Sequence, residues 1–300
     1  MHGTRGLPQY CLMRCAALLG LALLSSCGVP QPTVDVRVPP FARASYEPLS
    51  RAAVVAIALR EWRLFGSPVD DSPPGSYRPA TPDDKPERQQ GLWQRVGEYW
   101  WLAMNPGAPE AAWTGRHDAS GVVFPASEDG RYAWSAAFVS YVMRIAGAGA
   151  RFPYSASHSD YINLAKQMRL GQTTNWLVVA EAPEAYAPQP GDLICLGRGT
   201  ARDLRYDDLP AGHFPGHCDI VVDVSAPDAI SVVGGNVDDA VTLKHVPVTP
   251  DGRLAATDGR VIDPRYPWMV VLRLPIGVPV ASWDSCERSA TTAFVCAASA

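Results

Sequence analysis

Three polar residues lie where a nucleophile, a base and an orienting group could act together. Ser135 lies in AWSAAFVSY at the expected start of a helix, His217 lies at the expected start of a strand, and Asn236 follows the next strand. A serine at a helix N-terminus can attack a carbonyl when a histidine takes its proton and a third residue fixes the imidazole tautomer. The helix terminus also favours the negative charge of a developing oxyanion. The pattern therefore predicts acyl-transfer chemistry.

Ser135 has two other interpretations. Serine is among the best N-cap residues, where it stabilises a helix by about 1 kcal/mol, so this residue could serve only as a cap. It could also be what remains of a site that once used cysteine. A serine hydroxyl is too weak an acid to rest as an ion pair with histidine, so catalysis needs a well-placed base and an oxyanion hole.

The elements that must position these residues follow from hydrophobic periodicity. Apolar residues at helical spacing predict helices over 45–65, 87–104, 135–147 and 157–170, and the proline-rich segment 66–90 between the first two is expected to be an exposed loop. After Pro190 short runs rich in Val and Ile predict strands over 191–198, 217–225, 229–236, 240–248 and 268–275. Helices followed by an antiparallel sheet give an α+β fold.

Five motifs carry a resemblance to a known family: AWSAAFVSYVMRIAG, RFPYSASHSDYI, PQPGDLICLGR, GHCDIVVDV and SVVGGNVDDAV. In this order they resemble the bacterial domain-of-unknown-function family 2272 over residues 45–275. That family is similar to the CHAP and NlpC-type cell-wall amidases and peptidases, so the resemblance implies a papain-like fold for a single domain. It also implies amide or peptide bonds of peptidoglycan as substrate.

The resemblance assigns roles by position. Ser135 stands where the relatives carry their nucleophilic Cys, His217 matches the catalytic His of a Gly-His motif, and Asn236 matches the polar third residue. Trp134, His158 and Asp219 are candidates for the wall of a substrate groove. A catalytically inactive scaffold that binds cell-wall peptides or a protein partner is the alternative function.

The N-terminus predicts export and a lipid anchor. Residues 1–26 have a positive start and a nine-residue apolar run, which is typical of a signal peptide and too short to span a bilayer. The segment Leu-Ser-Ser-Cys resembles a bacterial lipobox, so Cys27 is expected to carry lipid and 27–44 to be a proline-rich tether. Gly28, and not Asp, follows the cysteine, so the resemblance to sorted lipoproteins implies the outer membrane, facing the periplasm, as the expected location. Residues 276–300 are expected to be a C-terminal tail.

Cysteine usage and charge limit the other partners. Four cysteines remain after export, Cys195, Cys218, Cys286 and Cys296, and their pairing stays open among three possibilities, with two buried thiols as the alternative to a Cys195–Cys218 bond. A formal net charge of -4 gives no basic stripe, which argues against nucleic acid. Pro215 between His213 and His217 argues against a helical metal site, so neither a metal nor another cofactor is expected. The aromatic group 93–113 is interpreted as core, with a sugar-stacking surface as the alternative.

Overall fold

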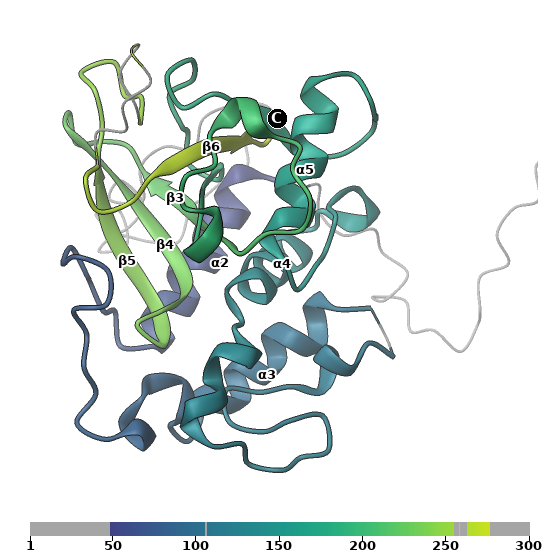
Figure 1. Ribbon diagram of the computed structural model, residues 1–300, viewed down its shortest axis with the longest axis vertical. Helices are drawn as coiled ribbons and strands as arrows, with labels where there is room; N and C mark the ends of the chain where they lie inside the picture. Colours follow the sequence, from purple (N-terminus) through teal and green to yellow (C-terminus); the bar gives the residue numbers. More distant parts are fainter. Residues whose placement is uncertain (1–48, 106, 255–257, 259–262, 277–300) are drawn as a thin grey trace, which may run out of the picture. The chain divides into compact units, whose positions relative to one another are not determined.

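The computed structural model describes residues 49–105, 107–254, 258 and 263–276, which belong to one compact unit spanning 46–300. Its four described α-helices are α2 (Arg51–Leu64), α3 (Leu92–Ala103), α4 (Ser135–Ile145) and α5 (His158–Arg169) (Figure 1). Its strands are β1 (Val179–Glu181), β2 (Leu193–Gly197), β3 (Gly216–Asp223), β4 (Ala229–Val237), β5 (Ala240–Pro247) and β6 (Trp268–Arg273). Short 3-10 helices lie at Pro82–Asp84, Pro86–Arg88, Pro109–Ala112, Ala126–Tyr132, Gly149–Arg151, Gly199–Ala201 and Tyr206–Asp208. The α+β class expected from the sequence is confirmed.

The six described strands form one antiparallel sheet in the order β1-β6-β2-β3-β4-β5. Five of them coincide with the expected apolar runs, while β1 was not expected. Its three residues are too few to show an alternating pattern, and it forms by pairing with β6 at the sheet edge. Cys195 on β2 lies directly opposite Cys218 on β3, and the two form a disulfide.

The sheet buries apolar side chains on both faces, which explains why β2 is apolar at nearly every position. Cys218, Ile220 and Val222 of β3 join the main core, to which the four helices contribute. Val221, one residue out of phase, belongs to a second cluster with residues of β2, β4, β5 and β6. Since side chains alternate along a strand, His217 and Asp219 share the face of Val221 rather than that of Cys218.

Two helices begin later than their sequence patterns indicated. Ser50 takes the N-cap position of α2, and its hydroxyl accepts a hydrogen bond from the Ala53 N–H, so the helix starts at Arg51 instead of residue 45. The second helix starts at Leu92, because the segment before it folds as the 3-10 turn Pro86–Arg88 and then passes through Gly91 at φ 90°.

The segment 66–90 is only partly the exposed loop that its prolines predicted. Val69 forms a β-bridge with Leu243, and at the far end Glu87 and Arg88 are buried at 3% and 4% exposure. Arg88 is held there by Asp129 and by the carbonyl of Phe124. The loop therefore packs against the domain at both ends.

A close approach between α4 and β4 depends on Gly235. A Cβ at this position would lie 2.5 Å from the Cβ of Phe138, far inside van der Waals contact. The absence of a side chain lets the N-terminal half of α4 press against β4, at the end of the sheet where Asn236 follows.

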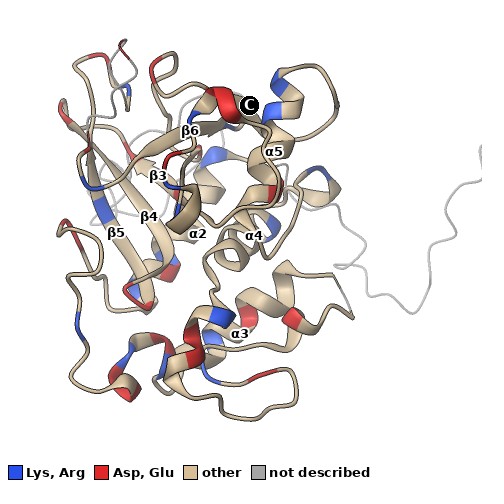
Figure 2. Cartoon of the chain, in the orientation of Figure 1, with Lys and Arg blue, Asp and Glu red and all other residues tan. Residues whose placement is uncertain are grey.

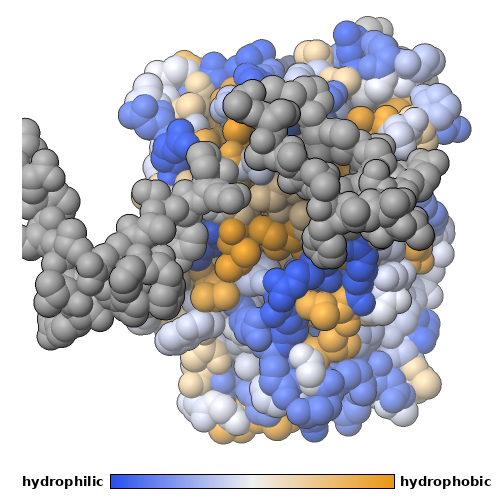
Figure 3. Space-filling view, turned by 180° about the vertical axis from the view of Figure 1, so that it is seen from behind, coloured by the Kyte–Doolittle hydropathy of each residue, from blue (hydrophilic) through white to orange (hydrophobic). Residues whose placement is uncertain are grey.

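The surface mixes charge and hydropathy. Lys and Arg are interspersed with Asp and Glu on the described helices and loops (Figure 2), and from behind hydrophobic areas lie between hydrophilic ones (Figure 3). Of the aromatic group 93–113, Tyr99 and Trp100 are in the core, whereas Trp101 is 67% exposed. None of the described helices has the length and apolar character that crossing a bilayer requires.

Candidate active site

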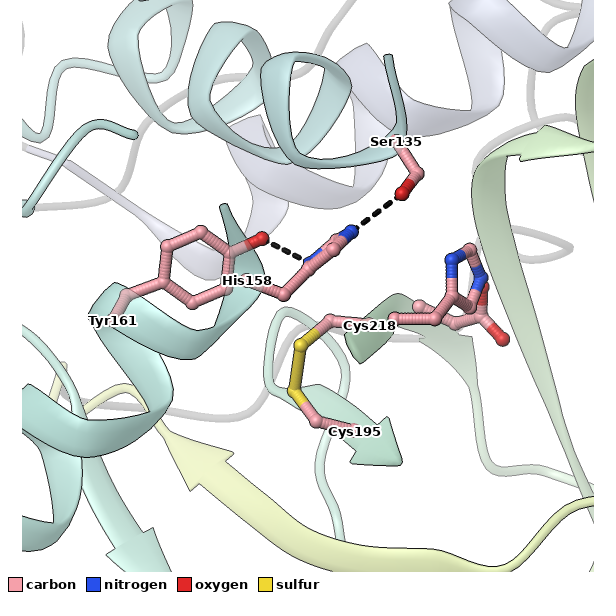
Figure 4. Close-up of a disulfide and its surroundings, with 7 residues drawn as sticks. Ser135, His158, Tyr161, Cys195 and Cys218 are labelled. Carbon is pink, nitrogen blue, oxygen red and sulfur yellow. Dashed lines mark hydrogen bonds and ion pairs between the residues drawn. A yellow bond between two sulfur atoms is a disulfide. The ribbon is translucent and has the colours of Figure 1, made fainter. Parts of the chain in front are cut away.

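Ser135 is the first residue of α4, but its hydroxyl does not cap that helix. Trp134 occupies the N-cap position, and its carbonyl accepts the bond from the Phe138 N–H. The Ser135 Oγ lies instead 2.5 Å from Nε2 of His158, at 6% exposure of the serine (Figure 4). The helix-cap interpretation is therefore wrong, and the serine is paired with a histidine.

His158 is the first residue of α5, and its ring is hydrogen-bonded at both nitrogens. Nε2 faces Ser135, and Nδ1 bonds to the Tyr161 hydroxyl, one turn further along the same helix (Figure 4). Burial lowers the pKa of His158 well below its ordinary value, and the neighbouring His217 lowers it further. The imidazole is therefore neutral at physiological pH, and one of its two nitrogens is a hydrogen-bond acceptor.

His217 belongs to a second cluster and is not the partner of Ser135. Its Nε2 lies 2.8 Å from the Asp219 Oδ1, and the other Asp219 oxygen lies 2.6 Å from Lys244 Nζ of β5. Burial raises the pKa of Asp219, but Lys244 and His217 outweigh it and hold this pKa well below its usual range. The ionised carboxylate can only accept, so His217 Nε2 carries the proton and donates it.

This arrangement leaves His217 Nδ1 as an unpaired acceptor. The atom is buried and has no hydrogen-bond partner among the described residues. Burial lowers the pKa of His217, although Asp219 opposes the shift, so the ring is neutral with a lone pair on Nδ1. The rings of His158 and His217 have their centroids 5.5 Å apart. The two clusters are thus neighbours with separate hydrogen-bond networks.

The prediction that Asn236 orients His217 is wrong. Asn236 lies in the left-handed region at φ 55°, beside an irregularity in the β4–β5 register, and Asp219 holds the histidine in its place. The backbone of β4 passes so close to Asp219 that a Cβ at Gly234 would lie 1.9 Å from its Oδ1. Asn236 contributes to the cavity walls instead.

Two of the three expected groove residues lie behind the surface. Trp134 and Asp219 have 0% exposure, because Trp134 packs against Phe65 and Tyr99 while Asp219 sits between His217 and Lys244. His158 does line a cavity, as proposed for the groove.

Two adjoining cavities surround these clusters. The larger cavity, of about 820 Å³, has Ser135, Ala136 and His158 in its wall. The smaller cavity, of about 590 Å³, has His217 and Lys244 in its wall. Their linings share Gly75, Arg198, Asn236 and Asp238. Both volumes are in the range of ligand-binding sites in proteins.

Glu87 is a wall residue of the larger cavity that sequence reasoning missed. Its Oε2 accepts a 2.6 Å hydrogen bond from the Trp134 indole, immediately before Ser135 in the chain. Burial, reinforced by Asp239, raises the pKa of Glu87 to about 8, so this carboxyl is protonated at neutral pH. It positions the residue that caps α4.

The sequence carried weak signals for the other missed residues. Tyr161 follows His158 at the i,i+3 spacing that brings side chains together on a helix. Lys244 is a charged residue between the apolar Leu243 and Val246 of a predicted strand, where a charge that is buried is expected to have a partner. No group of three or more His, Cys, Asp or Glu side chains suited to a metal ion occurs in the described part of the chain. The segments predicted as signal peptide and tether, with Cys27, and the Cys286 and Cys296 positions lie outside it.

Comparison with known proteins identifies the family. The sequence model of the family described as "Uncharacterized protein conserved in bacteria (DUF2272)" matches residues 87–274. No curated protein and no solved structure matches the chain. The residues of both hydrogen-bonded clusters and Glu87 lie within the matched range, which covers more than half of the 300 residues. The chain therefore belongs to this family of bacterial proteins.

Proposed function

We propose that this protein is an amide or peptide hydrolase in which Ser135 is the nucleophile and His158 the base. The observation that carries the proposal is the 2.5 Å contact between Ser135 Oγ and His158 Nε2 in the wall of the larger cavity. A nucleophile and a base within hydrogen-bond reach, with the base oriented by a third group, is the arrangement that acyl transfer needs. Here the third group is Tyr161.

The chemistry follows from these contacts. Ser135 Oγ attacks the substrate carbonyl as His158 Nε2 takes the hydroxyl proton, and the resulting oxyanion lies against the N-terminal N–H groups of α4. Ala136 at this terminus also lines the larger cavity. The C–N bond then breaks as His158 returns the proton to the leaving amine. A water molecule, deprotonated by the same nitrogen, hydrolyses the acyl ester and releases Ser135 and the acid.

Tyr161 controls whether His158 can act as the base. A lone pair on Nε2 requires the proton on Nδ1, so Tyr161 accepts a hydrogen bond in the reactive tautomer. In the other tautomer the phenol donates to Nδ1, and Nε2–H faces Ser135. Burial, with the charge of Asp160, raises the pKa of Tyr161 well above its ordinary value, so the phenol keeps its own proton in both states. Catalysis therefore selects one of two hydrogen-bond orientations in a fixed geometry.

Peptidoglycan peptides at the cell envelope are the substrate that we propose. The expectation comes from the resemblance to cell-wall amidases, together with a signal peptide and a lipidated Cys27 that would hold the protein at the outer membrane, facing the periplasm. The Cys195–Cys218 disulfide supports export, because such bonds persist in oxidising compartments. A papain-like fold is part of the same proposal: a nucleophile at a helix N-terminus beside an antiparallel sheet supports it. The base would then come from α5 instead of a strand.

The alternative is a scaffold that binds cell-wall peptides or a protein partner without cleaving them. The low exposure of Ser135 and His158, at 6% and 4%, favours this second candidate, because a substrate carbonyl needs access to the hydroxyl.

Mass spectrometry of defined muropeptides incubated with the full chain tests the proposal. We expect cleavage by the unaltered protein and a loss of at least about 10³-fold in Ser135→Ala and His158→Gln. His213→Gln is the matched control, since His213 also lines the larger cavity but bonds to Ser159. Retained cleavage in His158→Gln with loss in His217→Gln would contradict the assigned base. Muropeptide binding without any product would favour the scaffold.

A further inference from the structure

The smaller cavity carries an excess of positive charge that the proposed chemistry does not use. Its wall includes Arg198, Arg202, Lys244 and Arg265. Two of these cations are already paired: Lys244 with Asp219 at 2.6 Å, and Arg265 with Asp263 at 3.0 Å.

The other two cations of this wall are Arg198 and Arg202. Neither guanidinium has a hydrogen bond or ion pair with any described residue, and both side chains are exposed. They flank the short helix Gly199–Ala201 and line the same cavity. Arg198 also lines the larger cavity that holds Ser135, so it stands where the two cavities meet.

The acidic residues of the smaller cavity do not neutralise these arginines. Asp70 and Asp238 are hydrogen-bonded to each other through their side chains. Burial, together with that bond to Asp70, raises the pKa of Asp238 to about 7, so the two carboxyls share one proton below this pH. The pair then contributes a single negative charge against two unpaired guanidinium groups.

His217 adds a second, independent feature. Its Nδ1 is a buried acceptor without a partner among the described residues, and the ring is part of the cavity wall. A buried polar atom of this kind costs stability unless something satisfies it, so a ligand with an N–H donor is favoured.

We propose that the smaller cavity binds a carboxylate-bearing segment of the peptide substrate, with Arg198 and Arg202 contacting the carboxylate and His217 Nδ1 accepting a neighbouring N–H. Guanidinium groups suit carboxylates because they present paired donors in a plane. The inference rests on the proposed function, since it takes the ligand to be the peptide whose amide Ser135 attacks. It gives that substrate a free carboxylate near the cleaved bond.

Isothermal titration calorimetry on the full-length Ser135→Ala protein at pH 6.5 tests this inference without turnover. The probes are a muropeptide tetrapeptide with a free C-terminal carboxylate and the same peptide as its C-terminal amide. We expect the acid to bind at least about tenfold more tightly, as charge-assisted hydrogen bonds imply. Adding Arg198→Ala and Arg202→Ala should abolish the preference. Adding Arg205→Ala should keep it, because this exposed arginine lines neither cavity.

The outcomes separate this inference from the proposed function. Equal affinity for acid and amide, or no binding of either, overturns the carboxylate site even if the unaltered protein cleaves muropeptides. A preference for the acid that depends on both arginines supports the site, even if the unaltered protein releases no product.

Discussion

Replacing Glu87 with glutamine tests how burial shifts the pKa of one carboxyl that lies behind the proposed nucleophile. Glu87 is 3% exposed and holds the indole of Trp134, the residue before Ser135. Burial, reinforced by the negative charge of Asp239, raises its pKa from 4.5 to about 8. Glutamine keeps the carbonyl that accepts the indole N–H but removes the titration, so the substitution separates packing from protonation.

The sign of the effect follows from proton linkage. Between pH 4.5 and about 8, folded Glu87 holds a proton that the unfolded chain has released, so raising the pH favours unfolding. The stabilisation is fully present below 4.5 and is lost as the pH rises through the folded pKa. A shift of this size corresponds to about 5 kcal/mol, since each pKa unit is about 1.4 kcal/mol. We therefore expect that, as the pH rises from 4.5 to about 8, the free energy of unfolding of the unaltered protein falls by several kcal/mol relative to that of Glu87→Gln.

Urea unfolding followed by tryptophan fluorescence from pH 4.5 to 9 measures this difference. Subtracting the curve of Glu87→Gln from that of the unaltered protein removes the titration of all other groups. Glu110→Gln is the control, because Glu110 has no side-chain hydrogen bond or ion pair among the described residues. If the curves of the unaltered protein and Glu87→Gln stay parallel within about 1 kcal/mol, the reasoning from burial is refuted.

Three further perturbations test the site and its support. Lys244→Met leaves Asp219 buried without its cation, so we expect the free energy of unfolding in urea to fall by about 3–5 kcal/mol. The loss should be smaller when Asp219→Leu is added, and equal losses would refute the pairing. Ser135→Cys should keep a thiol pKa at or above about 8.5, since burial disfavours the charged pair; an iodoacetamide alkylation profile with a midpoint below pH 7 would contradict this. Gly235→Ala should cost about 1–3 kcal/mol in thermal unfolding, whereas Gly130→Ala, with open space around it, should cost little, and similar melting temperatures for both would argue against the close contact.

Periodicity was sufficient to predict most of the fold. In the four helices and in five of the six described strands, the spacing of the apolar residues reflects burial on one face or on both faces. The α+β class follows from the order of these elements. The exceptions are local: β1 is too short to show a period, and Glu87 is buried by contacts with Trp134 and Asp239, which are distant in the sequence. Neither feature is encoded by neighbouring residues.

The histidine partner of Ser135 was misassigned although the alternation of β3 carries a signal for the orientation of His217. In His217–Asp223 the apolar Cys218, Ile220 and Val222 share one parity, and Val221 is the one apolar residue of the other. The assignment of His217 rested on its Gly-His motif and not on this alternation. A shift of one residue reverses every side chain of a strand, and the structure places Cys218 on the helix side. His158 meets Ser135 through the packing of α5, a tertiary contact between residues 23 positions apart.

The electrostatics of the site give a physical reason for a serine at position 135. A cysteine nucleophile is activated by a thiolate–imidazolium pair, which needs a histidine that readily becomes charged. Burial lowers the pKa values of both His158 and His217, and His158 is held by a neutral phenol instead of a carboxylate. These surroundings disfavour a resting ion pair. They are compatible with a neutral hydroxyl that loses its proton only during attack, so a serine at position 135 matches its environment.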